Sequence, residues 1–162
     1  MTKNKKSDKL PIFGLLIAAF FNYICLKMCK MARNKSKSDA RKYEDYYKLL
    51  AKWMVKKQQG KNITNYLYSM GFKEIAIYGM KEVGQILLGE LDAEKVKVKY
   101  AIDQSGESSE EISIEVYYPD DLLDKVDAIV VTPIYYFDDI KRHMETKVGC
   151  PIISIEEIID KC

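Results

Sequence analysis

The sequence has few of the residue types that build metal centres or nucleophilic active sites. It contains one histidine and four cysteines, namely His143, Cys25, Cys29, Cys150 and Cys162. The cysteine spacings match no zinc-binding pattern, and a single histidine cannot complete one. The chain also lacks a nucleophile elbow and the lysine-containing phosphate loop of NTPases. Nothing in the sequence therefore predicts a metal ion or a set of catalytic residues, and no single residue indicates an enzymatic activity.

Acidic residues are scarce in the first part of the chain and abundant in the rest. Residues 1–61 carry 16 Lys and Arg against 4 Asp and Glu, a net charge of +12, whereas residues 62–162 carry 10 against 20, a net charge of −10. An acidic domain repels a polyanion, which argues against nucleic acid as its partner. The basic residues 1–42 surround an apolar segment, so an anionic membrane is the expected partner of this arm.

The apolar segment is residues 10–26, which contain no charged side chain. As a helix it is about 25 Å long, at the short limit of what a bilayer requires. Two interpretations stay open: a membrane anchor, or a helix buried against a partner protein or a second copy. More Lys and Arg follow the segment than precede it, which favours a cytoplasmic domain tethered to the inner face of the membrane. We expect a basic arm at 1–38, a helical lead-in at 39–72 and a Rossmann-like domain at 73–162.

The stretch 74–84 is the most informative part of the chain. Residues 75–78 form a short apolar run that ends at Gly79, and from Glu82 onward apolar residues recur at helical spacing. Strand, glycine turn and helix open a βαβ unit. Such a unit places backbone N–H groups at a helix N-terminus, where a phosphate binds favourably.

The glycines of this stretch fit part of a dinucleotide-binding motif. Gly79 and Gly84 match the first and third glycines of G-x-G-x-x-G, and Lys81 occupies the position of the second. Asp103 follows at the end of the next predicted strand, where the motif has an acidic residue for the ribose. The spacing therefore predicts a nucleotide site, although a side chain at position 81 hinders close approach of the backbone to a phosphate.

Four more strands are predicted along the chain. Alternating patterns indicate strands at 96–103 and 112–117. The second has polar residues on one face, which indicates a solvent-exposed strand at the edge of the sheet. Continuous apolar runs at 128–131 and 152–155 indicate buried strands. With right-handed crossovers, these patterns predict a single five-stranded parallel Rossmann-like α/β sheet of order 3-2-1-4-5 with helices on both faces. A proline followed by two aspartates predicts a short helix at 119–123.

Two helices are predicted before the sheet. Aromatic and apolar residues recur at three and four over 43–54, and a shorter helix starts at Asn62 or Thr64 and is stopped by Gly71. We expect these helices to form a hairpin against the sheet or its edge. A charged, serine-containing linker at 33–42 is expected to separate them from the apolar segment.

The candidate site lies where the strand order reverses, outside the carboxyl ends of the first and fourth strands. The residues predicted there, or beside it, are Gly79, Met80, Lys81, Gly84, Asp103, Thr132 and Tyr135. In the functional interpretation a phosphate lies over the first turn, Asp103 accepts from ribose hydroxyls, and Thr132 or Tyr135 lines the pocket. In the structural interpretation Gly79 serves only the turn, Gly84 only close helix packing, and Asp103 is a surface carboxylate.

A family resemblance rests on four short segments: residues 75–80 (IAIYGM), 100–103 (YAID), 130–133 (VVTP) and 150–154 (CPIIS). With them the chain resembles a group of small bacterial Rossmann-type domains associated with cell-surface polysaccharide synthesis. It is also similar to the nucleotide-binding-like C-terminal domain of sugar C-methyltransferases. The resemblance covers about residues 43–162, and it implies a nucleotide or nucleotide-sugar ligand at a cytoplasmic membrane face.

Three functions of different classes are compatible with these patterns. The first is a nucleotide- or nucleotide-sugar-binding module accessory to bacterial surface polysaccharide synthesis, with a nucleotide-sugar or NAD(P) as ligand. The second is a degenerate Rossmann-fold interaction domain that binds no ligand. The third is an NAD(P)-dependent oxidoreductase. A homo-oligomer or a transferase partner is compatible with the first two.

Overall fold

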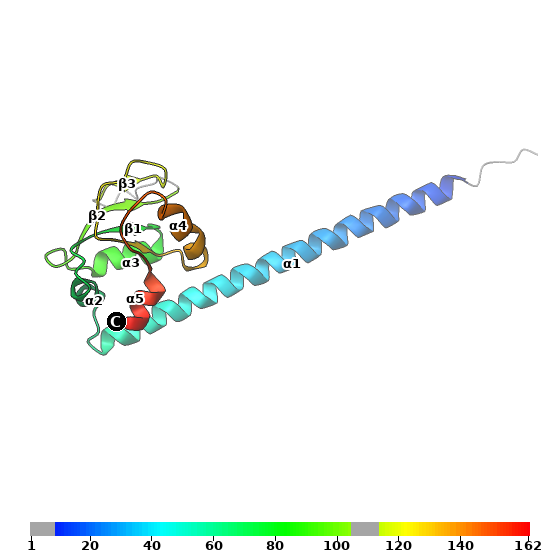
Figure 1. Ribbon diagram of the computed structural model, residues 1–162. Coiled ribbons are helices and arrows are strands. Elements are labelled where there is room, and N and C mark those ends of the chain that lie inside the picture. Colours follow the sequence, from blue (N-terminus) through cyan, green and yellow to red (C-terminus); the bar gives the residue numbers. More distant parts are fainter. Residues whose placement is uncertain (1–8, 105–113) are drawn as a thin grey trace, which may run out of the picture. The chain divides into compact units, whose positions relative to one another are not determined.

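The computed structural model describes residues 9–104 and 114–162, and of residues 9–19 it describes the backbone alone. The chain divides into two compact units, residues 1–46 and residues 47–162. The elements, in chain order, are α1 (Lys9–Gln58), α2 (Ile63–Ser69), β1 (Glu74–Tyr78), α3 (Glu82–Glu90), β2 (Lys97–Ile102), β3 (Val116–Tyr117), β4 (Ala128–Val131), the 3-10 helix η1 (Ile134–Tyr136), α4 (Phe137–Met144), β5 (Ile152–Ser154) and α5 (Ile155–Lys161) (Figure 1).

The sheet confirms the predicted topology. Its five strands lie in the order β3-β2-β1-β4-β5, and every neighbouring pair is parallel. The central strand β1 has β2 on one side and β4 on the other, with Ile75 opposite Val98 and Ala128. All four residues of β4 are buried, as the continuous apolar run at 128–131 predicts for a strand covered on both faces.

One face of the sheet packs against α4. Its buried cluster is made of alternate strand residues and two residues of α4, namely Ala76, Tyr78, Tyr100, Ile102, Ile129, Val131, Ile152, Ile140 and Met144. The hydroxyl of Tyr100 donates to the carbonyl oxygen of Asp124 at 2.6 Å. Burial, followed by the nearby groups of Cys150 and Asp124, raises the pKa of Tyr100 to about 12. The polar end of this ring therefore stays bonded within the protein.

The opposite face carries the other alternate strand residues, such as Ile75 and Ile77. Buried apolar residues come from four helices: Leu49 and Trp53 of α1, Ile63 and Leu67 of α2, Val83 and Leu87 of α3, and Ile155, Ile158 and Ile159 of α5. Figure 1 shows α5 beside the last turns of α1, where Lys52 pairs with Asp160. The indole Nε1 of Trp53 is buried and, within the described residues, has no hydrogen-bond partner.

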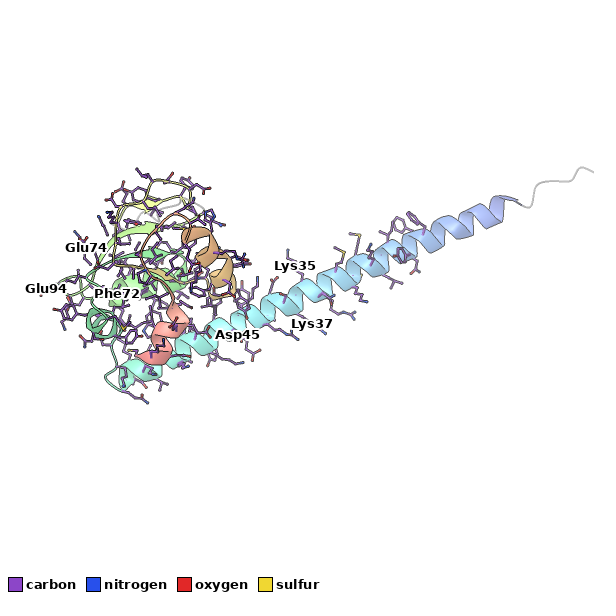
Figure 2. All side chains as sticks on the ribbon, in the orientation of Figure 1. Lys35, Lys37, Asp45, Phe72, Glu74 and Glu94 are labelled. Carbon is purple, nitrogen blue, oxygen red and sulfur yellow. The ribbon has the colours of Figure 1, made fainter. Side chains whose placement is uncertain are left out.

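The predicted linker at 33–42 is wrong, because α1 runs unbroken from Lys9 to Gln58. This stretch contains neither proline nor glycine, and its serines cost a helix only a few tenths of a kcal/mol each. Extending an existing helix through such residues is easier than nucleating a second one. Figure 2 shows Lys35 and Lys37 projecting from different sides of this part of the helix.

The start and stop of α2 agree with the prediction. Of the two predicted starts, Asn62 is the N-cap, and its side chain accepts from the N–H of Asn65 at 3.1 Å. At the other end Gly71 has φ +86, and Phe72 N–H donates to the carbonyl of Leu67. The helix therefore ends at a residue in the left-handed backbone conformation, which strains any residue with a Cβ. Glycine adopts this conformation at position 71 without that strain.

The predicted helix at 119–123 is wrong, and the segment forms a turn followed by irregular chain. Asp121 N–H donates to the carbonyl of Tyr118 at 3.0 Å, while its carboxylate accepts from Tyr118 N–H at 2.7 Å. Lys147 donates to the carbonyl of Pro119 at 2.8 Å and pairs with Asp120, which lowers the pKa of that carboxyl group. The backbone is therefore fixed by a closed turn. Leu122 is 95% exposed, while Leu123 packs against the buried cluster beside α4.

Two further predictions are only partly covered by the described residues. The third strand, predicted at 112–117, is paired at Val116–Tyr117, and residues 112–113 lie outside the described part of the chain. The predicted anchor at 10–26 falls mostly on residues whose side chains are not described. Among the residues that were described, no helix combines the length and apolarity needed to cross a bilayer.

Candidate functional site

Polar side chains gather at the carboxyl edge of the sheet. Four polar residues of the described chain are buried, and three of them, Asp103, Thr132 and Ser154, follow or end strands β2, β4 and β5. The strand order reverses beside β1, so the turn after β1 lies at the centre of this edge. Buried polar groups need hydrogen-bond partners, and their partners define what this edge can do.

The turn after β1 depends on Gly79. This residue has φ +90, and a Cβ built on it would lie 2.7 Å from Pro133 and 2.8 Å from Oγ1 of Thr132. Its N–H donates to the carbonyl of Ile102 at 2.8 Å, which extends the pairing with β2 by one residue. The turn therefore packs closely against Thr132 and Pro133, and it has no room for a side chain at position 79.

Gly84 serves helix packing, as the third glycine of the motif does. A Cβ at this position would lie 2.1 Å from the carbonyl oxygen of Gly79, which belongs to the backbone and cannot rotate away. Gly84 is buried in the first turn of α3, facing the turn after β1. The two predicted glycines are thus brought together, and each is needed for the backbone to reach this conformation.

Asp103 lies against the same turn. Its side chain is about nine-tenths buried, and Oδ2 accepts from the backbone N–H of Met80 at 2.8 Å. The interpretation of Asp103 as a surface carboxylate is therefore wrong. The Met80 amide points at a carboxylate of the protein itself. The turn thus already holds one negative charge, and this bond fixes the position of Asp103.

Thr132 also turns toward the first βα turn. Its Oγ1 lies 2.8 Å from the carbonyl oxygen of Gly79 and 3.2 Å from that of Tyr78. Because a hydroxyl has one proton, the shorter contact with Gly79 takes the donated hydrogen bond. Thr132 therefore ties β4 to the turn after β1, and its oxygen keeps only acceptor capacity for any other group.

Lys81 and Tyr135 lie outside this buried group. Lys81 is exposed at the N-cap of α3, and its side chain makes no capping hydrogen bond. Tyr135 belongs to η1, directly after β4, and is 40% exposed. Both residues are at the predicted edge of the sheet. The structure brings Gly79, Met80, Gly84, Asp103 and Thr132 into contact, and it leaves these two side chains at the surface.

Sequence reasoning missed Tyr78 and Gln104. Burial raises the pKa of the Tyr78 phenol, a hydrogen bond with Gln104 lowers it, and the charges of Asp103 and Asp120 raise it again. The Tyr78 phenol is therefore close enough to Asp103 for the charge of that carboxylate to raise its pKa, although in the sequence Tyr78 is one more residue of the apolar first strand. The signal available in the sequence was its position, since the last residue of a strand before the glycine turn reaches the carboxyl edge.

A concavity lies between α4 and α5. It has a volume of about 510 Å³ and is lined by Ile134, Phe137, Asp138, Ser154, Glu156, Glu157, Asp160 and Lys161. Four carboxylates against one ammonium make it unsuitable for a phosphate. Across residues 9–104 and 114–162, no three His, Cys, Asp or Glu side chains are grouped so that they could hold a metal ion.

Comparisons with protein-family models, with curated proteins and with solved structures found no match to this chain.

Proposed function

We propose that residues 47–162 bind a ribose-bearing ligand, a nucleotide or nucleotide-sugar, at the carboxyl edge beside Gly79. The observation that carries the proposal is the buried Asp103 carboxylate held by the Met80 amide. Burying a carboxylate is costly unless it is hydrogen-bonded, so a carboxylate fixed at this edge needs a reason. At the end of the second strand of such sheets, an acidic side chain accepts from ribose hydroxyls.

The phosphate of such a ligand would be bound differently from the phosphate of a standard dinucleotide site. The Met80 amide already donates to Asp103, so it cannot also serve a phosphate. Lys81, exposed at the start of α3, supplies an ammonium group near the same turn. We therefore expect affinity to depend more on the sugar hydroxyls than on the phosphate. The family resemblance implies that the sugar-nucleotide serves surface polysaccharide synthesis.

Ligand binding is tested by thermal unfolding and calorimetry of the full chain with UDP, UDP-sugars, NAD and NADP. A ligand at 100 times its dissociation constant adds about 2.7 kcal/mol to the free energy of unfolding. Asp103→Asn keeps an oxygen for the Met80 N–H but removes the charge, so we expect affinity to fall about tenfold or more. A 2′-deoxy ligand should lose affinity for the wild type in the same way.

The matched control is Asp138→Asn, which removes a carboxylate from the concavity between α4 and α5. It should leave the affinity unchanged. If Asp138→Asn weakened binding and Asp103→Asn did not, the ligand would occupy that concavity and the proposed site would be wrong. An unfolding temperature that no member of the panel shifts would remove the proposed function.

A second candidate function is an interaction domain that binds no small molecule. It is favoured by the closure of the turn: Met80 N–H and Thr132 O–H both donate within the protein, and Pro133 packs on Gly79. In this case replacing Asp103 and Lys81 leaves activity in cells unchanged. Disrupting the aromatic helix at 43–54, where Tyr47 is 73% exposed, abolishes it. An oxidoreductase, the third function, would require NAD or NADP to be the ligands that stabilise the chain.

A further inference from the structure

We propose that residues 20–42 of α1 bind an anionic lipid surface. Every side chain of residues 20–38 is exposed. Six large apolar side chains, Phe20, Phe21, Tyr23, Leu26, Met28 and Met31, are each at least 63% exposed. Such a concentration of exposed apolar groups on one helix segment indicates an interaction surface.

Positive charge follows the apolar residues along the same helix. Between Lys27 and Lys42 the chain has seven Lys and Arg and one acidic residue, Asp39, a net charge of +6. Lys27 to Lys37 covers about 15 Å of helix. That length is comparable to the polar layer of one leaflet, roughly 5–8 Å, together with a screening length of about 8 Å. The basic residues therefore match the depth over which anionic headgroups attract them.

The charges decide between a lipid surface and a second copy of the chain. A parallel pair of these helices would bring two sets of seven cations together, which opposes association. The apolar residues are also spread over more than half of the helix circumference, whereas a helix pair needs them on one narrow seam. A lipid surface accepts this wider spread of apolar groups, and its headgroups neutralise the cations. Binding at the surface requires no spanning length.

The acidic part of the chain is not expected to bind the lipid. Residues 62–162 have a net charge of −10, so an anionic bilayer repels them. The basic part of the chain should therefore determine the lipid dependence of the whole chain. This inference does not rest on ligand binding at Asp103, and the two can fail separately.

Co-flotation of the full chain with vesicles tests the proposal. We expect binding to vesicles of phosphatidylcholine with about 30% phosphatidylglycerol, an anionic lipid, and little binding to phosphatidylcholine alone. Raising the salt from about 0.1 M to about 1 M shortens the screening length to roughly 3 Å and should weaken binding at least tenfold. Equal binding to both vesicle types would overturn the proposal.

Two matched triple variants locate the surface. The first variant should bind the anionic vesicles between about tenfold and about a hundredfold more weakly. It carries Arg33→Gln, Lys35→Gln and Lys37→Gln. Lys61→Gln, Lys97→Gln and Lys125→Gln remove the same charge from the other unit and should leave binding unchanged. Glutamine keeps the helix propensity of the basic residues, and circular dichroism checks that both variants fold as the wild type does.

The apolar side chains are tested by Phe20→Ser, Phe21→Ser and Leu26→Ser. This variant should bind the anionic vesicles more weakly than the wild type at about 0.1 M salt, while sedimentation in the absence of vesicles stays as in the wild type. If the wild type instead self-associated without lipid, and this variant became monomeric, the segment would bind a second copy and the proposal would be wrong. Equal vesicle binding by the two charge-removing triple variants, the one at 33–37 and its control, would also overturn it.

Discussion

Gly84 and Gly89 are both in α3, but their surroundings differ. A Cβ at Gly84 would meet the carbonyl oxygen of Gly79 at 2.1 Å, whereas a Cβ at Gly89 would have no heavy atom within 4 Å. The obstacle at Gly84 is backbone, so relief requires α3 to move away from β1. Replacing each glycine by alanine therefore compares the same added methyl group at a position without space and at a position with space.

We expect Gly84→Ala to lower the free energy of unfolding by about 2 kcal/mol or more, because overpacking against backbone cannot be relieved by a rotamer change. Gly89→Ala should raise it by about 0.5–1 kcal/mol, since alanine favours the helix. Urea unfolding of both variants measures the difference. Equal effects of the two substitutions would show that α3 does not pack on the turn as described.

The sequence predicted the backbone of this site better than its hydrogen bonds. The spacing of Gly79 and Gly84 follows from how closely a helix must approach a strand, and that requirement is local. The bond from Met80 N–H to Asp103 joins residues 23 positions apart, and its existence depends on side-chain orientation at the end of β2. For this reason the motif indicated a phosphate site, while the amide of the turn is bound to a carboxylate.

At the scale of elements, Asp127 connects the starts of β1 and β4. Its carboxylate accepts from the N–H groups of Lys73 and Glu74 at 2.8 and 2.9 Å, and its own N–H donates to the carbonyl of Glu74. These donors, Glu74 first, hold the pKa of Asp127 below its ordinary value. The two strands are thereby aligned at the edge opposite the candidate site.

This arrangement predicts a pH dependence. A carboxyl group whose pKa is lower in the folded state stabilises that state above its unfolded pKa of about 3.9. The stabilisation is lost as the pH falls through the folded pKa. Asp127→Asn should lower the free energy of unfolding by about 1 kcal/mol at pH 7 and show a smaller further loss below about pH 4. Urea unfolding from pH 2.5 to pH 7 checks this, and parallel curves for both proteins would contradict it.

The elements themselves were predictable where a period was sustained. Continuous and alternating apolar runs gave the buried and half-buried strands and hence the order of the sheet. The helix at 119–123 failed because its start signals, a proline and two aspartates, are equally those of a turn. The linker at 33–42 failed because polar composition was taken as a break, although nothing in it interrupts helical hydrogen bonding.

At the scale of the whole molecule, α1 contributes to two units. Its residues from Tyr47 onward belong to the second, in which Leu49 and Trp53 are buried. Lys56 donates to the carbonyl oxygens of Asp160 and Cys162, so the same turns hold the end of α5. These last turns of α1 are therefore part of the domain, not an extension of the basic arm.

Two truncations test this division. A chain of residues 47–162 should keep the unfolding temperature of the full chain within a few degrees. A chain of residues 59–162 loses two large buried side chains, each worth roughly 2–5 kcal/mol, which is comparable to the stability of a small domain. It should therefore be largely unfolded by circular dichroism. Equal unfolding temperatures for the two truncations would place the boundary after residue 58.

The indole of Trp53 is buried, and its N–H has no hydrogen-bond partner among the described residues, so its fluorescence reports on its surroundings. This is the single tryptophan of the chain, so its emission describes one junction, where α1 meets the helices beneath the sheet. Detachment of those turns would hydrate the ring and shift its spectrum to the red. Ligand binding at the turn of Gly79 should leave the emission maximum of Trp53 unchanged.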